Sequence, residues 1–431
     1  MTYFWFRRDL RLEDNVGLWH ALNEGDAVQC LFIFDSEILS KLEDKDDRRV
    51  SFIHAQIRRL KKELQKFGSD LRVEHGSPIE IWRKILNEES VTAVFCNRDY
   101  EAYAQKRDGT IHDLLEEHQV GFNQYKDHVI FEAQEVLKDD GTPYTVFTPF
   151  MRKWKTHFQS SMLEGKPSEG LTSGFASTEA LPIPSHEDLG FVKNETHFPD
   201  RRIPEDILAS YHETRDLPYL LGTSRLSVHL RFGTISIRSL HKSAIDKNEK
   251  YWNELIWREF YQMILVQFPH VVGGSFRPQY DRLEWLNNEE HFQAWCEGKT
   301  GFPIVDAGMR ELNETGFMHN RVRMIVSSFL VKDLLVDWRW GEAYFARKLI
   351  DFELASNNGG WQWAAGCGCD AAPYFRIFNP DSQTKKFDPK FEYIRKWIPE
   401  FDSFDYPNPI VDHKQARLRA LDFYKKELKR E

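Results

Sequence analysis

The segment AVQCLFIFD, residues 27–35, decides the fold of the N-terminal part of the chain. It is an apolar run with the β-branched and aromatic content of a buried strand. A second strand-like run, Thr2–Phe6, precedes it, and the residues between them include a helical stretch at Asp14–Asn23. Strands that alternate with helices in this way indicate a parallel sheet.

The same alternation continues to about residue 125. We expect three further strands and three further helices, at Leu71–Glu74, Val91–Cys96, Gly121–Tyr125, Arg48–Phe67, Ser77–Glu89 and Glu101–His118. Residues 1–125 are therefore predicted to form a Rossmann-like α/β domain with a doubly wound parallel sheet. Ligands of such sheets bind at the carboxyl ends of strands, which here lead into Arg7–Arg11, Asp35–Ile38 and Asn97–Glu101.

Beyond the sheet the character of the sequence changes twice. Between Gly141 and Pro199 it is rich in Pro, Ser, Gly and Thr, so residues 126–200 are predicted to be a long surface connector. Residues 201–431 have helical periodicity almost throughout and are predicted to form an all-α domain. Within that domain, Asn320–Trp340 is expected to be one long amphipathic helix.

Composition excludes several classes of protein. The longest unbroken apolar run, Cys30–Phe34, is far shorter than the ~20 residues that span a membrane. Charged residues interrupt the early apolar stretch, so we expect no signal peptide. Five scattered cysteines argue for a reducing cytoplasm and against a disulfide scaffold. The net charge of −9 excludes a broadly basic surface for nucleic acid, although it allows a local basic patch.

Several familiar motifs are absent or incomplete. The tripeptide Gly298–Thr300 resembles the end of a phosphate-binding loop, but the first glycine of that motif is replaced by Gln293. No GxGxxG follows the first strand. Cys367 and Cys369 supply only two ligands, whereas closed structural zinc sites use four, so we expect no metal site.

Other segments carry more polar and aromatic chemistry than packing requires. GTSRLS, residues 222–227, places three hydroxyls and an arginine in a turn before a helix-like segment, which suits a diphosphate, although ordinary helix caps have similar residues. YWNELIWREFY, residues 251–261, puts Glu254, Trp257 and Arg258 on one polar and aromatic helix face.

Two further segments have the same unusual character. In GFMHNRVRM, residues 316–324, Asn320, Arg323 and Met324 share a helix face. In DFELASNNGGWQW, residues 351–363, two amides, two glycines and two tryptophans suit the close approach of a flat ligand, and we expect a Gly-Gly-Trp turn there.

These motifs together resemble the photolyase/cryptochrome family, and within it most nearly the class I cyclobutane pyrimidine dimer photolyases. The resemblance runs from WFRRDLRLEDN at residues 5–15 to PIVDHKQAR at residues 409–417. It implies FAD, active in its reduced form, which absorbs light and donates one electron to a dimer flipped out of UV-damaged DNA. It also implies a carbon-carbon lyase that needs no metal, and we expect a monomer.

The resemblance implies roles for individual residues. Arg323 and Asp351 would pair beside the flavin, and Glu353 would lie at the adenine side. Asn357 would face the reactive ring nitrogen of the flavin and, with Glu254 and Asn320, would act in catalysis. The complete set of implied FAD-binding residues is Tyr211, Thr223, Ser224, Arg225, Leu226, Ser227, Arg258, Arg323, Asp351, Glu353 and Asn357.

The resemblance also implies a DNA-binding surface and an electron-transfer chain. The residues implied for lesion and DNA binding are Glu254, Trp257, Asn320, Arg321, Met324, Trp363, Arg376 and Lys386. Trp361, Trp338 and Trp285 match the family's electron-transfer triad, with Trp361 nearest the flavin and Trp285 nearest solvent.

A second, antenna chromophore is expected at the strand ends of the sheet. The folate-binding members carry an Asn-Glu pair where this chain has Tyr103 and Ala104. The sequence therefore favours a deazaflavin or FMN over methenyltetrahydrofolate.

Two alternative functions stay open. A cryptochrome would be a blue-light signalling protein, but repair is favoured by the retained pocket residues Glu254, Trp257, Asn320, Met324 and Trp363. A photolyase for the (6-4) photoproduct would carry two adjacent histidines where this chain has His319 and Asn320.

Overall fold

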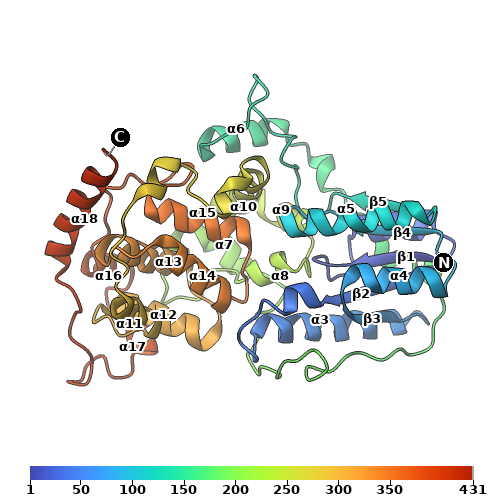
Figure 1. The fold of residues 1–431 in the computed structure, drawn as a ribbon, viewed down its shortest axis with the longest axis horizontal. Helices are drawn as coiled ribbons and strands as arrows, with labels where there is room; N and C mark the ends of the chain where they lie inside the picture. The colour runs from blue at the N-terminus through green and yellow to red at the C-terminus, as the bar shows by residue number, and fades with distance from the viewer. Residues whose placement is uncertain (430–431) are drawn as a thin grey trace. The chain divides into compact units, whose positions relative to one another are not determined.

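The computed structural model describes residues 1–429, which form two compact units (Figure 1). The α/β unit comprises residues 1–135, 155–202 and 225–246. The helical unit comprises residues 136–154, 203–224 and the chain from residue 247 onward. The units therefore interleave along the chain, whereas the sequence predicts three consecutive ranges, 1–125, 126–200 and 201–431.

The predicted parallel sheet is confirmed. Its strands are β1 (Thr2–Phe6), β2 (Val28–Asp35), β3 (Leu71–Gly76), β4 (Ala93–Asn97) and β5 (Gly121–Tyr125). The strand order is β3-β2-β1-β4-β5, and all four neighbouring pairs are parallel. The order reverses between β1 and β4, which is the position where doubly wound sheets bind ligands.

Alternate side chains of the strands attach helices to the two faces of the sheet. On one face, Tyr3 and Trp5 of β1 contact the Trp82 ring edge-on at centroid distances of 5.6 and 5.9 Å. On the opposite face, Phe4 lies against Gly17, where an added Cβ would meet its ring carbon at 3.0 Å. The helices that follow these strands are α1 (Val16–Glu24), α2 (Ser36–Leu39), α3 (Arg48–Gln65), α4 (Pro78–Glu88) and α5 (Ala102–Glu117).

The predicted surface connector contains more structure than the sequence suggests. Helix α6 (Phe147–His157) buries Phe147, Phe150 and Trp154, so the prediction of an irregular segment is wrong there. Further along, Phe175 forms an isolated parallel bridge with Val28 of β2. The remaining regular structure consists of short 3₁₀ turns at Ser160–Leu163, Ser168–Gly170 and Thr172–Gly174.

The C-terminal part of the chain is helical, as predicted. Two short helices, α8 (Ser227–Arg231) and α9 (Ile237–Ala244), belong to the α/β unit. The helical unit contains α7 (Glu205–Thr214), α10 (Glu249–Gln267), α11 (Glu289–Glu297), α12 (Pro303–Thr315), α13 (Asn320–Ser328), α14 (Trp338–Lys348), α15 (Leu354–Ala365), α16 (Pro380–Phe387), α17 (Glu392–Trp397) and α18 (His413–Glu427). Short 3₁₀ turns occur at Pro269–Val272 and Pro278–Arg282.

The prediction of one long helix over Asn320–Trp340 is wrong. Helix α13 ends at Ser328 and continues as a π-helical turn over Phe329–Asp333. Leu335 then adopts a left-handed conformation with φ of 52°, and the Asp337 side chain caps α14. The apolar residues in this break are buried in the same core as both helices, so the hydrophobic pattern continues where the helix does not.

The expected Gly-Gly-Trp turn is also wrong, because α15 runs through both glycines as a helix. A Cβ at Gly359 would lie 2.2 Å from a ring carbon of Tyr261, so this glycine lets α10 and α15 pack closely. A Cβ at Gly360 would meet nothing within 4 Å. The two glycines therefore serve different purposes on one helix.

Candidate functional site

A buried polar cluster joins α10 to the start of α15. The Glu353 Oε1 atom accepts hydrogen bonds from Gln262 Nε2 at 3.1 Å and from Arg258 Nη2 at 3.4 Å. All three side chains are buried. The Gln262 Oε1 atom has no hydrogen-bond partner among residues 1–429. Buried acceptors without partners are costly, so this oxygen is suited to a donor on a ligand.

Sequence reasoning identified Arg258 and Glu353 but missed Gln262. The signal was present, because Gln262 lies four residues after Arg258 on the same helix face.

The predicted pair of Arg323 and Asp351 is formed. Arg323 Nη2 donates to both carboxylate oxygens of Asp351, at 2.9 and 3.2 Å. Arg323 Nε also donates to the backbone oxygen of Met318 at 2.8 Å, which fixes the orientation of the guanidinium.

Glu342 of α14 orients Asn357. Asn357 Nδ2 donates to the backbone oxygen of Glu342 at 3.1 Å and to its Oε1 atom at 2.9 Å. Burial raises the pKa of Glu342, and the hydrogen bond from Asn357 opposes that shift. Because both N–H groups of the amide are used, Asn357 has its Oδ1 atom left to present to a ligand. Sequence reasoning missed Glu342, since nothing in its local motif marks it as the partner of Asn357.

The segment after α7 approaches the helix closely. A Cβ at Gly222 would lie 2.6 to 2.8 Å from atoms of Thr214, so only glycine fits there. Ser224 Oγ and Tyr251 Oη are hydrogen-bonded at 3.1 Å, and the Tyr251 ring contacts Tyr211 edge-on at 5.0 Å. Thr223 and Ser224 belong to the helical unit, whereas the segment that starts at Arg225, Leu226 and Ser227 belongs to the α/β unit.

Glu254 of α10 forms an ion pair with Arg215, which directly follows α7. The Arg215 guanidinium also lies 5.5 Å from the centre of the Tyr211 ring. Burial raises the pKa of Glu254, and the positive charge of Arg215 opposes that shift. Sequence reasoning missed Arg215, which lies 39 residues from its partner.

The two tryptophans implied for the lesion are both half-buried. The Trp257 ring is stacked on Phe147 with a centroid distance of 3.6 Å and an interplanar angle of 9°. The Trp363 ring lies 6.5 Å from that of Phe378. Phe147 comes from the segment that the sequence suggested was a connector, so its contact with Trp257 was not foreseen.

A group of cations surrounds the start of α13 and the end of α16. Arg321 lies 4.4 Å and Lys386 lies 5.0 Å from the centre of the Phe387 ring. Asn320, the first residue of α13, is exposed, and Met324 on the next turn is half-buried. Arg376 is exposed and lies 5.7 Å from the Phe378 ring, whose other aromatic neighbour is Trp363.

The implied electron-transfer tryptophans all lie in or against the main core of the helical unit. Trp361 and Trp338 are each only 2% exposed, whereas Trp285 is half-buried. The Trp361 ring contacts Phe345 at 5.0 Å and Trp295 at 6.0 Å. This order of exposure is compatible with Trp285 as the outermost member.

In the α/β unit, cationic and aromatic groups gather at the strand ends. Tyr103 Oη donates to Asp35 Oδ2 at 2.6 Å. The Arg107 guanidinium lies 4.9 Å from the Trp5 ring and 5.9 Å from the Tyr103 ring. Ala104 is buried.

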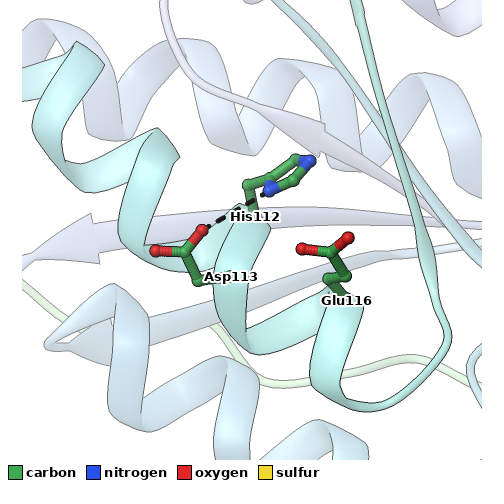
Figure 2. A group of neighbouring side chains, drawn as sticks. All are labelled: His112, Asp113 and Glu116. Carbon is green, nitrogen blue, oxygen red and sulfur yellow. Dashed lines mark ion pairs between the residues drawn. The ribbon is translucent and has the colours of Figure 1, made fainter.

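One group of potential metal ligands lies on α5, where His112, Asp113 and Glu116 occupy one exposed turn (Figure 2). His112 Nδ1 and Asp113 Oδ1 are 3.6 Å apart. All three side chains are exposed, as charged groups on a solvated helix face usually are, and we assign them no ion. Cys367 and Cys369 are both buried thiols.

Comparison with known proteins defines the class of protein. The model of the FAD binding domain of DNA photolyase matches residues 251–405, and the DNA photolyase model matches residues 2–169. Curated relatives named deoxyribodipyrimidine photo-lyase include those of Halobacterium salinarum, at 37% identity, and Vibrio cholerae, at 39%, with 99% of both chains covered in each case. This chain belongs to the DNA photolyase family.

Solved structures agree with this assignment. A class III photolyase from Agrobacterium tumefaciens is 31% identical with a TM-score of 0.88, covering 100% of this chain and 98% of its own. An archaeal photolyase from Sulfolobus tokodaii with two FAD molecules is 35% identical with a TM-score of 0.82 over 99% of each chain. A Synechocystis cryptochrome is 25% identical with a TM-score of 0.83, covering 98% and 99%. Within residues 1–429, no helix has the length and apolar character to cross a membrane.

Proposed function

We propose that this chain is a deoxyribodipyrimidine photo-lyase that splits cyclobutane pyrimidine dimers in UV-damaged DNA by light-driven electron transfer. The observation that carries the proposal is one face of α10. Glu254 and Trp257 lie together there, and each of them contacts a side chain from another segment. Arg215 pairs with the Glu254 carboxylate, and Phe147 stacks on Trp257. A carboxylate beside a flat aromatic face suits a pyrimidine pair, which has polar edges and apolar faces.

The residues of the polar cluster fit FAD. Gln262 offers a buried acceptor, and Gly360 leaves the backbone of α15 open to close approach. When bound and reduced, FAD supplies one electron to the dimer after absorbing light. Within the helical unit, the residues proposed to hold it are Tyr211, Thr223, Ser224, Arg258, Gln262, Arg323, Asp351, Glu353 and Asn357.

Within that set, Asn357 is proposed to orient the flavin ring without placing a charge beside it. Both N–H groups of the Asn357 amide donate to Glu342. The Asn357 oxygen is therefore left to accept a hydrogen bond from a protonated ring nitrogen of the flavin. Arg323 remains neutralised by Asp351 beside it.

The lesion pocket is proposed to bind the dimer by two kinds of contact. Glu254 and Asn320 hydrogen-bond the polar edges of the pyrimidines, and Trp257, Met324 and Trp363 contact their faces. Arg321, Arg376 and Lys386 bind the DNA backbone, so a local basic rim acts on a protein with a net charge of −9.

We propose that electrons from an external reductant at the surface pass toward the cofactor through Trp285, Trp338 and Trp361. Trp361 and Trp338 are equally buried and only Trp285 is partly exposed, which supports Trp285 as the member that meets the external donor. This route would restore the reduced flavin after its oxidation. The electron that repairs the dimer passes directly from the flavin and does not use the route.

A deazaflavin or FMN antenna is proposed at the strand ends of the α/β unit. Tyr103, held by Asp35 and close to Arg107, offers an aromatic face and cationic surroundings for such a ring. The second chromophore released by denaturing the purified protein should therefore have a flavin-type absorption spectrum, and a folate spectrum would contradict the proposal. We also propose that the protein is a cytoplasmic monomer, which light scattering of the purified protein and cell fractionation would test.

The decisive experiment illuminates the reduced protein with two damaged oligonucleotides of the same sequence. Cyclobutane dimers should be restored in single-stranded and double-stranded DNA, whereas (6-4) photoproducts should remain. Comparable repair of the (6-4) lesion would overturn the substrate assignment, and repair of neither lesion would favour a signalling protein.

A further inference from the structure

Two consecutive residues after α7 form ion pairs with two different helices. Arg215 pairs with Glu254 on α10, and Asp216 pairs with Arg321 at the start of α13. Asp216 Oδ1 accepts from Arg321 Nη2 at 2.8 Å and from Nε at 3.2 Å. The nitrogens occupied by Asp216 are therefore one complete edge of the guanidinium fork.

That edge is one of the two with which an arginine can bind a phosphate in two-point fashion. Arg321 also lies over the Phe387 ring, on which Lys386 is the second cation. The Asp216 side chain is 39% exposed and that of Arg321 is 17% exposed. A carboxylate thus stands at the surface among cations that the proposed function assigns to the DNA backbone.

We propose that Asp216 is a specificity-determining residue that competes with DNA phosphate for Arg321 and thereby weakens binding to undamaged DNA. This inference rests on the proposed function. Undamaged DNA gains only backbone contacts, so occupation of Arg321 removes a large share of its affinity. A flipped lesion adds contacts to Glu254 and Trp257, so its binding depends less on this arginine.

The test uses the full-length protein with its cofactor, in the dark, and the variant Asp216→Asn. The amide keeps the size and the hydrogen-bonding oxygen of the aspartate but removes its charge. Affinities are measured over a range of salt concentrations for an undamaged duplex and for the same duplex with one thymine dimer.

The variant should bind undamaged duplex about fivefold more tightly at low salt, which is the upper range for an exposed ion pair. The slope of log affinity against log salt should become steeper by about 0.9, the value for one more neutralised phosphate. Affinity for the dimer should rise less, so the preference for damaged DNA should fall. An unchanged slope, or weaker binding to both duplexes, would overturn the proposal.

Two controls separate this effect from a general change of charge. The double variant Asp216→Asn with Arg321→Gln should lose the gain, because the released guanidinium is no longer there. Asp402→Asn removes a carboxylate from a matched pair with Arg395 in the same unit, at 2.8 Å, and should leave the slope unchanged. An equal gain from Asp402→Asn would contradict a specific role for Asp216. If the unmodified protein shows no preference for the dimer, the proposed function fails. The salt dependence of binding to the undamaged duplex would still show whether Asp216 competes with phosphate for Arg321.

Discussion

Two pairs of tryptophans in the helical unit differ mainly in depth. Trp361 and Trp338 are almost fully buried in the core, whereas Trp257 and Trp363 are half-buried and lie against Phe147 and Phe378, respectively. A buried indole among apolar rings is shielded from water, while a half-buried one offers a flat apolar surface to a ligand. The same side chain therefore suits electron transfer in one place and base recognition in the other.

Helix α15 carries one tryptophan of each pair within three residues, Trp361 proposed for electron transfer and Trp363 for base recognition. Trp361 and Trp363 lie at positions i and i+2, which do not share a face of a helix. Trp361 packs against Trp295 and Phe345, whereas Trp363 lies near Phe378. Extended backbone over these residues would instead direct both indoles to the same side.

The largest effect is expected from Trp361→Phe. Phenylalanine keeps an aromatic ring but is much harder to oxidise, so photoreduction of the oxidised flavin by external donors should almost disappear. Once the flavin is reduced chemically, dimer repair should persist, because that electron does not use the tryptophan route. Absorption spectra during illumination measure the first quantity, and product analysis of a dimer oligonucleotide measures the second.

Trp295→Phe is the matched control, because Trp295 is buried and contacts Trp361 at 6.0 Å but lies outside the proposed route. It should leave photoreduction near the original rate. Photoreduction at the original rate in Trp361→Phe would contradict the route. Loss of repair in the pre-reduced variant with FAD still bound would assign Trp361 to the lesion side.

A smaller loss is expected from Glu254→Ala, which tests the half-buried region. Removing a hydrogen-bond partner from this pocket costs about 1–3 kcal/mol, so affinity for the dimer should fall by roughly fivefold to 150-fold. FAD content should stay the same, as measured by absorbance. Arg215 loses its partner in this variant, so Glu254→Gln should be compared, and it should lose less than the alanine variant. Unchanged dimer affinity in Glu254→Ala would remove Glu254 from the pocket.

Phe147→Leu tests whether the stack fixes the orientation of Trp257. Aromatic pairs contribute about 0.5–1.5 kcal/mol beyond burial, so dimer affinity should fall by only a few-fold. Phe150→Leu on the same helix is the control, because Phe150 is buried and its ring packs against Phe260. Equal effects of both variants on dimer affinity would indicate general destabilisation of α6 instead.

The smallest effect on repair is expected from Lys332→Met. This variant tests whether the core of the helical unit keeps the buried Lys332 amine uncharged. Lys332 is buried, donates to the backbone oxygen of Ala365 at 3.0 Å and lies 3.9 Å from the centre of the Tyr424 ring. Burial lowers its pKa to about 7.

Between pH 7 and its ordinary value of 10.5, Lys332 is neutral in the folded state and protonated in the unfolded state. The unfolded state then binds more protons, so the unfolding free energy should rise with pH in this window. Relative to Lys332→Met, the difference should be flat below pH 7 and should grow in favour of the unmodified protein above it. Denaturant unfolding at several pH values measures this, and parallel pH profiles would contradict it.

Local features of the sequence predicted much of this molecule correctly. The five strands agree with the structure within two residues. Strands β1 and β2 are buried at every position, and such strands consist of short continuous apolar runs that a sequence shows directly. Helical spacing also predicted that Glu254, Trp257 and Arg258 share one face, whereas the pairing of Arg323 with Asp351 was implied by the family resemblance and is formed in the structure.

Local patterns gave wrong predictions where the backbone left the α-helical conformation while the apolar side chains stayed buried. The apolar periodicity of Asn320–Trp340 continues through the π turn and the left-handed Leu335, because every part of that stretch faces the same core. The two glycines of α15 suggested a turn, yet Gly359 is required for the approach of Tyr261 from another helix.

The sequence by itself determined the alternating sheet, the helical character of the C-terminal half and the side chains with the relevant chemistry. Only the tertiary structure decided which groups support them: Arg215 behind Glu254, Phe147 behind Trp257 and Glu342 behind Asn357. The physical reason is that periodicity reports on burial along one element, whereas a supporting partner comes from another element, at separations from 15 to over 100 residues. Such a partner is selected by packing geometry, and no local pattern records it.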